Sequence, residues 1–403
     1  MNLISVDAAY RLLLQDAAPI GRTEELPLGQ AAGRVLATDI VALRTQPSFD
    51  ASAMDGYAVR SADLAGGPAA LRLIGEAAAG RAFDGVVGPG ETVRIFTGAP
   101  VPPGADAILI QEDVTVDAAG RILAGATVAE RQHVRFAGVD FREGATLLRG
   151  GMFLSPGAVA LAASGGHPTV SVRQRPRVAI LATGNELVMP GLAPGPAQIV
   201  ASNGFGVAAM VAAAGGEVID YGIAPDDEAA IAARLDQALA DGADIFVTIG
   251  GASVGDHDLV SAVFAARGVT LDFWKVAMRP GKPLMAGRLD GMRIVGLPGN
   301  PASSMVAAML FLAPLVSRLA GRADRARYRN GILGAAVPAN GERTDFVRSG
   351  VAVAEDGTTT VTPLPRQDSS LMSIYAHAQG LLMRPPNAAP AEAGQPCRYV
   401  PLD

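Results

Sequence analysis

Apolar strand-like runs alternate with helix-like runs between residues 175 and 323, and this alternation limits the possible folds more than any other feature of the chain. The runs Val178–Leu181 and Ile245–Ile249 are almost wholly apolar, which is typical of parallel strands buried on both faces. Strands and helices that alternate at this spacing form strand–helix–strand units. The sequence therefore predicts a doubly wound α/β domain with a mainly parallel sheet.

Each predicted strand of this region leads into a turn, a helix or extended chain. The strands are expected over Arg177–Thr183, Glu217–Ile223, Asp244–Ile249, Thr270–Ala277 and Arg293–Leu297. The helices are expected over Gly204–Ala214, Asp227–Ala240, Asp258–Ala266 and Ala302–Leu319. Because open sheets of this kind bind ligands beyond the carboxyl ends of their strands, a site is expected in the turns after the strands.

The rest of the chain has β patterning, with short apolar runs separated by glycine and proline turns. Before the α/β region, strands are expected over Tyr57–Arg60, Leu71–Glu76, Thr92–Thr97, Ala107–Gln111 and Thr127–Val134. After it, strands are expected over Gly331–Val337, Phe346–Ala354, Thr358–Leu364, Gly380–Met383 and Cys397–Val400. This spacing indicates a β-rich domain in the first part and a β-barrel or sandwich in the tail. A helix starting near Ser5 and a helix-like stretch at Gly157–Ser164 belong to an α+β segment that residues 141–174 rejoin.

Composition excludes several classes of function. The 403 residues carry a net charge of −6 and include 5% aromatic residues, so the chain offers neither a basic field for nucleic acid or membranes nor many rings for base stacking. A single cysteine, Cys397, and four scattered histidines argue against a disulfide framework and a zinc site. The N-terminal apolar stretch is interrupted by charges, and the run Met305–Val316 is shorter than a membrane span. We therefore expect a cytoplasmic protein.

Three strand ends in the α/β region continue into glycine-rich polar turns. These turns span Thr183–Leu187, Gly250–Asp256 and Pro298–Ser304. Glycine lets the backbone approach a ligand closely, and the N-terminus of a following helix offers free N–H groups to a phosphate. One such turn would more simply be a tight connection, but three at one edge of a sheet predict a ligand site.

Carboxylates are expected at the same edge, at Glu186, Asp226, Asp227 and Asp256. They would repel one another unless a cation lay between them, and hard oxygen ligands beside a phosphate suit Mg²⁺. The sequence does not decide which of Asp226 and Asp227 would bind the metal.

A short basic segment supplies cations that can bind an anion. Lys275 precedes the loop Met278–Pro283, which adds Arg279 and Lys282 and carries two prolines. Ordinary solvated surface charge is the alternative interpretation. Carboxylates, cations and amide-rich turns in one region favour a Mg²⁺-assisted phosphate reaction over proton-transfer chemistry.

The segment Gly251–Gly255 also matches the GxSxG pattern of serine hydrolases, with Ser253 as the nucleophile. A hydrolase would need a general-base histidine later in the chain. His257 is too close in sequence for the usual arrangement, and His377 lies in the separate tail. A hydrolase is therefore a remote alternative, and Ser253 fits better as a turn residue or a phosphate donor.

Two turns in the β-rich part are unusual. In Phe49–Ala58, Asp50 and Asp55 flank small residues, and Gly56 permits a tight backbone. The second turn, Ile95–Pro100, is polar and follows an expected strand. Either turn alone is more often structural than functional.

Six motifs occur in an order that resembles one known family. They are Ser52–Ala58, Thr97–Pro100, Thr183–Leu187, Gly250–Asp256, Pro280–Pro283 and Leu297–Pro301. Their order is similar to that of the molybdopterin molybdenumtransferases of the MoeA type, which are related to the E domain of gephyrin, and the resemblance covers nearly the whole chain. It implies insertion of molybdate into adenylylated molybdopterin with release of AMP, dependence on Mg²⁺, and a homodimer.

The resemblance also implies domain boundaries and partners. Residues 1–46 and 141–174 would form a discontinuous N-terminal linker domain, 47–140 the β-rich second domain, 175–325 the molybdopterin-binding domain, and 326–403 a C-terminal β-barrel. The cleft would lie between the α/β domain of one subunit and the second domain of its partner. A molybdopterin adenylyltransferase would act upstream, and factors for molybdoenzyme maturation would act downstream.

By motif position, Asp226 and Asp256 would hold Mg²⁺ and the substrate's phosphates, and Asp55, Thr97 and Glu186 would complete the catalytic residues. The substrate-binding residues would be Gly250, Gly251, Ser253, Gly255, Lys275, Arg279, Lys282, Pro298, Gly299, Asn300, Pro301, Ser303, Arg348 and Ser369. The cations and the serines at 303 and 369 would form the oxyanion site, since such groups suit a tetrahedral dianion. The alternatives are a surface cation for Arg348 and a loop hydroxyl for Ser369. Arg135 and Asp140 match another family pattern and would orient the second domain.

The chain departs from the family pattern at two positions. Arg279 stands where the family usually has lysine, which keeps the charge but offers a planar fork. Asn185 stands where many members have aspartate, which lowers the local negative charge. Two other functions remain open: adenylylation of molybdopterin, as in the related single-domain family, and a non-catalytic pterin-binding scaffold. The choice between molybdate and tungstate also remains open, because both are tetrahedral dianions.

Overall fold

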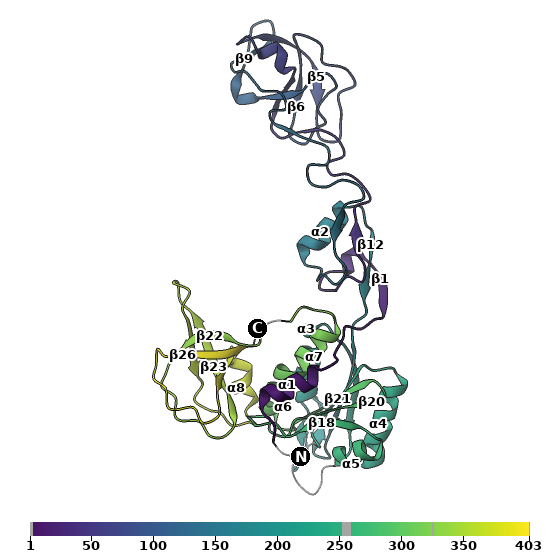
Figure 1. The fold of residues 1–403 in the computed structure, drawn as a ribbon, viewed down its shortest axis with the longest axis vertical. Helices are drawn as coiled ribbons and strands as arrows, with labels where there is room; N and C mark the ends of the chain where they lie inside the picture. The colour runs from purple at the N-terminus through teal and green to yellow at the C-terminus, as the bar shows by residue number, and fades with distance from the viewer. Residues whose placement is uncertain (1–2, 252–258, 325, 403) are drawn as a thin grey trace. The chain divides into compact units, whose positions relative to one another are not determined.

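The computed structural model describes residues 3–251, 259–324 and 326–402. The chain divides into two compact units (Figure 1). The first, here named the α/β–barrel unit, comprises Met1–Glu24, Gly33–Val35 and Arg173–Asp403; the second, named the β-rich unit, comprises Glu25–Ala32 and Leu36–Val172. The four domain boundaries expected from the resemblance stay a prediction.

The α/β–barrel unit contains the predicted doubly wound sheet. Its strands are β13 (Arg177–Thr183), β16 (Glu217–Ala224), β17 (Ile245–Ile249), β18 (Thr270–Trp274), β20 (Met285–Leu289) and β21 (Met292–Leu297). The spatial order is β16-β13-β17-β21-β20-β18. The first four strands are parallel, while β20 runs antiparallel to both β21 and β18. The parallel part is as predicted, and the hairpin of β20 and β21 is an addition.

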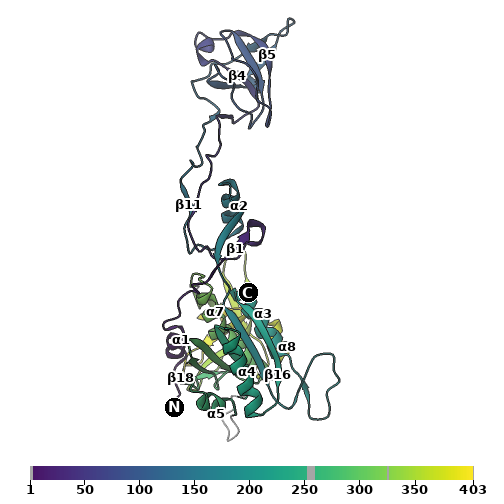
Figure 2. The ribbon, with the colours of Figure 1, turned by 90° about the vertical axis from the view of Figure 1, so that its right-hand side faces the viewer.

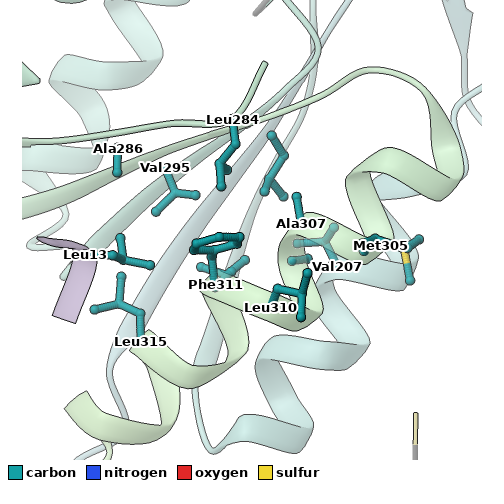
Figure 3. Packing of buried hydrophobic residues seen from close by; sticks show 14 of the residues in the cluster. Leu13, Val207, Leu284, Ala286, Val295, Met305, Ala307, Leu310, Phe311 and Leu315 are labelled. Carbon is teal, nitrogen blue, oxygen red and sulfur yellow. The ribbon is translucent and has the colours of Figure 1, made fainter. Parts of the chain in front are cut away.

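Helices cover both faces of this sheet. On one face lie α1 (Val6–Leu14), α3 (Asn203–Ala214), α6 (Pro301–Ala307) and α7 (Ala313–Leu319), and on the other α4 (Glu228–Ala240) and α5 (Leu259–Ala266). Both α3 and α4 pack against the edge strand β16 (Figure 2). Figure 3 shows the first face, where Phe311 lies among Leu13, Leu284, Val295 and Leu315. Burial of such side chains is the main source of stability of the unit.

Capping side chains fix where two of these helices begin. The Ser5 hydroxyl accepts the N–H of Ala8 at 3.2 Å, so α1 begins at the predicted place. The Asp227 carboxylate accepts the N–H of Ala230 at 2.8 Å at the start of α4. Such caps satisfy N–H groups that have no partner inside the helix.

The longest apolar helix is a core element. Residues Pro301–Leu319 form one continuous helical run, with a single π-helical segment at Ala308–Leu312 between α6 and α7. The run is long and apolar enough to cross a membrane, with a mean hydropathy of 1.6, and 72% of it is buried inside the protein. Its apolar character is explained by its packing against the sheet.

The tail forms the predicted barrel rather than a sandwich. The strands β22 (Arg329–Leu333), β23 (Thr344–Val353), β24 (Thr359–Pro363), β25 (Gly380–Arg384) and β26 (Pro396–Pro401) pair in the order β23-β24-β22-β26-β25, and β25 pairs back with β23. The short strand β19 (Met278–Arg279) adds to β23, and helix α8 (Met372–His377) also contacts β23. The basic loop of the α/β region is therefore hydrogen-bonded to the barrel.

The β-rich unit contains a sheet in the order β7-β4-β6-β5-β9-β8. Its strands are β4 (Gly56–Val59), β5 (Ala70–Ala77), β6 (Glu91–Ile95), β7 (Ala107–Ile110), β8 (Val114–Val116) and β9 (Ile122–Ala124), with 3₁₀ turns η2 (Ser61–Leu64) and η3 (Gln111–Asp113). A second pair joins β3 (Ala51–Ser52) to β10 (Val134–Arg135). The strand expected over Thr127–Val134 is wrong, because Arg131 and His133 take positive φ angles of 70° and 61°, which no regular strand accommodates.

The remaining elements surround the small core of Leu36, Leu154 and Val170. They are β1 (Thr23–Pro27) paired with β12 (Thr169–Arg173), β2 (Ile40–Val41) paired with β11 (Thr146–Leu148), helix α2 (Pro156–Ser164) and the turn η1 (Leu28–Gln30). Residues far apart in sequence thus meet here, as expected for a discontinuous α+β segment.

Candidate active site

The glycine turns after β13, β17 and β21 lie close together, as the sequence predicts. A Cβ atom placed on Gly250 would come within 2.6 Å of the Thr183 carbonyl oxygen, and one on Gly299 would lie 3.5 Å from the Gly250 Cα. Gly250 and Gly251 also have φ angles of 95° and 64°, a region that favours glycine. The close approach of the three backbones therefore depends on glycine at 250.

Two of the turns are joined by a reciprocal pair of hydrogen bonds. The Asn185 N–H donates to Asp226 Oδ2 at 3.1 Å, and the Asp226 N–H donates to Asn185 Oδ1 at 3.2 Å. The Glu186 carboxylate folds back over Gly184, so that a Cβ on that glycine would lie 2.5 Å from Glu186 Oε2. Both carboxylates belong to exposed residues. The structure thus places Glu186 and Asp226 at the carboxyl end of the sheet.

Asp226 and its neighbour Asp227 have different roles in the fold. Asp227 caps α4. Asp226 accepts the Asn185 N–H with Oδ2, and the Oδ1 of Asp226 has no hydrogen-bond partner among the described residues. Asp226 is therefore the one better placed to receive a ligand. Asp256, Ser253 and Gly255 lie outside the described residues. Within the described part of the chain, no three His, Cys, Asp or Glu side chains gather as metal ligands.

The turn after β21 is held by two side chains from other parts of the chain. Asn203, the first residue of α3, donates to the Gly299 carbonyl at 2.7 Å. Asn300 donates to the Ser369 hydroxyl at 3.2 Å, and the Ala302 N–H donates to the Ser369 carbonyl at 2.9 Å. The structure thus brings Ser369 to the turn that the sequence assigned to substrate binding. Sequence reasoning missed Asn203; its only signal is a polar residue at a helix start.

The following helix contributes Pro301 at its first turn and Ser303, which is buried. A Cβ on Gly281 would lie 3.6 Å from the Ser303 carbonyl, so the loop between Pro280 and Lys282 approaches this helix. The predicted residues of the two segments are therefore neighbours.

The three cations of the basic segment differ in their partners. Arg279 forms an ion pair with Asp345, whose side chain is only 9% exposed. Lys282 is exposed. Among the described residues, neither Lys275 nor Lys282 pairs with a carboxylate. Within the described part of the chain, the two ammonium groups therefore have no carboxylate partner, whereas Asp345 partly neutralises Arg279.

Arg348 is a fully buried cation in the barrel strand β23. Its Nη2 donates to the Asp368 carbonyl at 3.4 Å, while its Nε and Nη1 have no hydrogen-bond partner among the described residues. Burial lowers the pKa of the guanidinium, and the nearby Asp368 charge acts in the opposite direction. Arginine nevertheless stays protonated. The alternative of a surface cation is therefore wrong for Arg348, whose Nε and Nη1 are buried without a described hydrogen-bond partner.

The Gln367 side chain is hydrogen-bonded to the backbone of Arg348. Its side chain accepts the Arg348 N–H and donates to the Arg348 carbonyl, both at 2.9 Å. The next residues in the same loop are Asp368 and Ser369. One loop of the barrel therefore orients the buried guanidinium and also carries the serine that binds Asn300.

In the β-rich unit, the two predicted site residues are directly bonded. Asp55 Oδ1 accepts the Thr97 N–H at 2.7 Å and the Thr97 hydroxyl at 2.8 Å. These bonds lower the pKa of the Asp55 carboxyl, the backbone one contributing most, and Arg94 adds to the effect. A Cβ on Gly56 would lie 2.1 Å from the Leu109 carbonyl, so glycine is required beside this carboxylate. The Asp55 carboxyl therefore stays ionised to a lower pH than an ordinary aspartate.

The segment that contains Arg135 and Asp140 runs beside the first turn of this unit. The Ala137 N–H donates to Asp50 Oδ1 at 2.8 Å, and the Asp140 N–H donates to the Gln46 carbonyl at 3.2 Å. Asp50 therefore has a structural role, whereas Asp55, five residues later, is half-buried and bonded to Thr97.

Comparison with known proteins decides the family. A curated molybdopterin molybdenumtransferase from Haemophilus influenzae is 34% identical over 403 residues, with 100% of this chain and 99% of the relative covered. This chain belongs to the molybdopterin molybdenumtransferase family. Members of this family are transferases of molybdenum cofactor biosynthesis. A molybdopterin molybdenumtransferase 2 from Mycobacterium tuberculosis is 37% identical over 379 residues, with 92% of each chain covered.

Family models and solved structures agree with this membership in the molybdenumtransferase family. Residues 4–166 match the MoeA N-terminal region (domain I and II), 179–318 match a probable molybdopterin binding domain, and 330–402 match the MoeA C-terminal region (domain IV). A crystal structure of a molybdopterin biosynthesis MoeA protein from Pyrococcus horikoshii has a TM-score of 0.83 at 29% identity and covers 100% of both chains. The turns, cations and buried arginine therefore lie in a scaffold of molybdenum cofactor biosynthesis.

Proposed function

We propose that this chain inserts molybdate into adenylylated molybdopterin and releases AMP in a reaction that depends on Mg²⁺. The observation that carries the proposal is the buried Arg348, whose Nε and Nη1 have no partner among the described residues, and whose loop binds the turn at Asn300. A buried charge without a partner is costly. An oxyanion that accepts both donors would remove that cost, and the ammonium groups of Lys275 and Lys282 would supply further cations that suit a tetrahedral dianion.

The glycine turns would bind the nucleotide–pterin part of the substrate. Gly250, Gly251 and Gly299 bring backbone close together at the carboxyl end of the sheet, where N–H groups can approach phosphates. In this proposal, molybdate lies on the cation side and the phosphoanhydride lies over the turns. Attack of a water molecule on a phosphorus of the phosphoanhydride would release AMP, and the two thiols of the pterin would bond to molybdenum while one molybdate oxygen leaves as water.

Mg²⁺ would be held by Asp226 and Asp256. Of these two residues, Asp226 lies within the described part of the chain, and its chemistry fits a hard cation. Its carboxylate is exposed beside the turn at Gly184, and its Oδ1 accepts no hydrogen bond from a described residue. When bound, the metal would neutralise charge on the phosphates. Glu186 would line the cleft, and Asn185 would hold Asp226 in place.

We further propose a cytoplasmic homodimer in which Asp55 and Thr97 of one subunit complete the cleft of its partner. An assembly is supported by large exposed apolar side chains in one stretch of the α/β–barrel unit. They are Met189, Leu192, Ile199, Val200 and Phe205. Exposed apolar side chains that lie together on a protein surface often mark a site of contact with another protein. Molybdopterin adenylyltransferase would supply the substrate, and molybdoenzyme maturation factors would take the product.

The test is an AMP-release assay with the purified chain, adenylylated molybdopterin, Mg²⁺ and molybdate. We expect AMP release that requires both the metal and molybdate. The absence of release, under conditions in which a known member of the family succeeds, would overturn the proposal. The same assay with molybdopterin and ATP should show no consumption of ATP; consumption would instead indicate the adenylyltransferase reaction.

A further inference from the structure

Lys275 is fixed by its backbone in an unusual conformation. Its φ angle is 72°, which is uncommon for a residue other than glycine. Its N–H donates to the Leu284 carbonyl at 3.0 Å, and its carbonyl accepts the Ile4 N–H at 3.3 Å. The backbone of this lysine is therefore tied on both sides, and the left-handed conformation sets the direction in which its side chain leaves the chain.

The ammonium of Lys275 lies over an aromatic ring. Its Nζ is 4.3 Å from the centroid of Trp274, well inside the range of a cation–π interaction. The indole Nε1 is buried and has no hydrogen-bond partner among the described residues.

The ring itself is held by the sheet. Trp274 is the last residue of β18 and pairs with Met285 of β20. It also packs against the apolar cluster that includes Phe264 and Phe246. The indole is therefore a fixed platform.

We propose that Trp274 is a positioning residue that holds the Lys275 ammonium in place for the incoming oxyanion without neutralising it. This inference rests on the proposed function. Arg279 shows the physical reason by contrast: Asp345 orients that guanidinium but also partly neutralises its charge. An aromatic face restricts an ammonium through its quadrupole and leaves the net charge intact. Lys275 thus keeps its full attraction for molybdate.

Intrinsic fluorescence tests the proposal directly, because Trp274 is the one tryptophan of the chain. Titration of the full-length protein with molybdate should change the tryptophan emission saturably, since an anion bound to the ammonium over the ring alters the charge and the solvation beside the indole. Lys275→Met should abolish this response while circular dichroism stays unchanged. A wild-type protein that releases AMP but shows no emission change at saturating molybdate would overturn the proposal.

Two variants separate positioning from a structural role. Trp274→Leu should raise the KM for molybdate about tenfold, and Trp274→Phe about threefold, because a phenyl face binds a cation less well than indole. The KM for adenylylated molybdopterin should stay at the wild-type value in both. Phe264→Leu is the matched control, since it removes an aromatic ring from the same cluster and should leave the KM for molybdate unchanged.

The outcomes distinguish this inference from the proposed function. If wild type and variants all fail to release AMP, the proposed function fails. If wild type is active and Trp274→Phe and Trp274→Leu keep its KM for molybdate, the positioning role fails alone. A parallel rise in both KM values would show a general structural role and would also overturn it.

Discussion

The key charged groups of the two units differ in whether they have hydrogen-bond or ion-pair partners. In the α/β–barrel unit, Arg348 is buried with two nitrogens lacking a described partner, and Lys275 pairs with no carboxylate among the described residues. In the β-rich unit, Asp55 receives two hydrogen bonds from Thr97 on one oxygen. The first arrangement leaves donors without a described partner, which the proposed function assigns to an anion, whereas the second lowers the pKa of a carboxyl. We therefore expect substitutions in the first unit to affect oxyanion binding most, and those in the second to shift a pKa.

The largest effect should come from Arg348→Met. Loss of preorganised donors to an oxyanion costs about 10²- to 10³-fold in rate, so molybdate-dependent AMP release should fall by that factor. The variant should nevertheless melt at the wild-type temperature or above, because it replaces a buried charge, two of whose nitrogens have no described partner, by an apolar chain of similar length. Calorimetry and the AMP assay measure the two properties. Wild-type turnover in a folded variant would remove Arg348 from the anion site.

The next largest effects are expected at Asp226 and Asp227, two neighbouring residues of one turn with different roles. Asp226→Asn should lower Mg²⁺-dependent turnover about 100-fold, since a metal ligand stabilises charge in the transition state. Asp227→Ala should leave turnover within about twofold and lower the free energy of unfolding by about 1 kcal/mol, because it removes the cap of α4. Chemical denaturation and assays at several Mg²⁺ concentrations check both. The reverse pattern would show that Asp227 is the metal ligand.

A smaller effect is expected for Arg279→Met. Its side chain is 60% exposed and already paired with Asp345, so it contributes less to anion binding than a buried cation. The KM for molybdate should rise by less than about tenfold, measured beside Arg348→Met. An equal or larger loss at Arg279 would contradict the view that the unpaired, buried guanidinium dominates.

Local patterns predicted much of the fold because apolar periodicity and caps are local signals. Strand β13 and helix α4 begin and end within one residue of their predicted bounds. The hairpin of β20 and β21 was missed, although Asp290 and Gly291 form its turn with φ angles of 48° and 87°. An Asp-Gly pair between apolar runs is a strong hairpin signal, so the hairpin could have been predicted from the sequence.

The site was predicted in its residue types but not in its partners. The motif order pointed to Asp226 and to Arg279, yet no local pattern pairs Asn185 with Asp226 or Arg279 with Asp345. Those contacts join segments that are 41 and 66 residues apart and depend on how the sheet and barrel fold. The burial of Arg348 is likewise a property of the barrel interior, and a single charge in a strand carries no local sign of it.

The β-rich unit supplies the smallest and most specific expected change. Thr97→Val removes the hydroxyl bond to Asp55 and keeps the backbone N–H bond, which contributes more to the lowered pKa. The pKa of Asp55 should therefore rise part of the way toward its ordinary value, as measured by NMR titration of the side-chain carboxyl. Because the folded-state pKa lies below the unfolded one, these bonds stabilise the protein above the unfolded pKa, and this stabilisation is lost as pH falls through the folded pKa.

Thr358→Val is the matched control for this variant. Thr358 lowers the pKa of Asp356 through the same kinds of bond, in the barrel and on an exposed turn. Both variants should raise the pKa of their aspartate, but only Thr97→Val should move the acid limb of the turnover profile to higher pH. If both variants leave that profile unchanged, Asp55 has no role in the reaction, and the Thr97 bonds serve only to close the turn between β3 and β4.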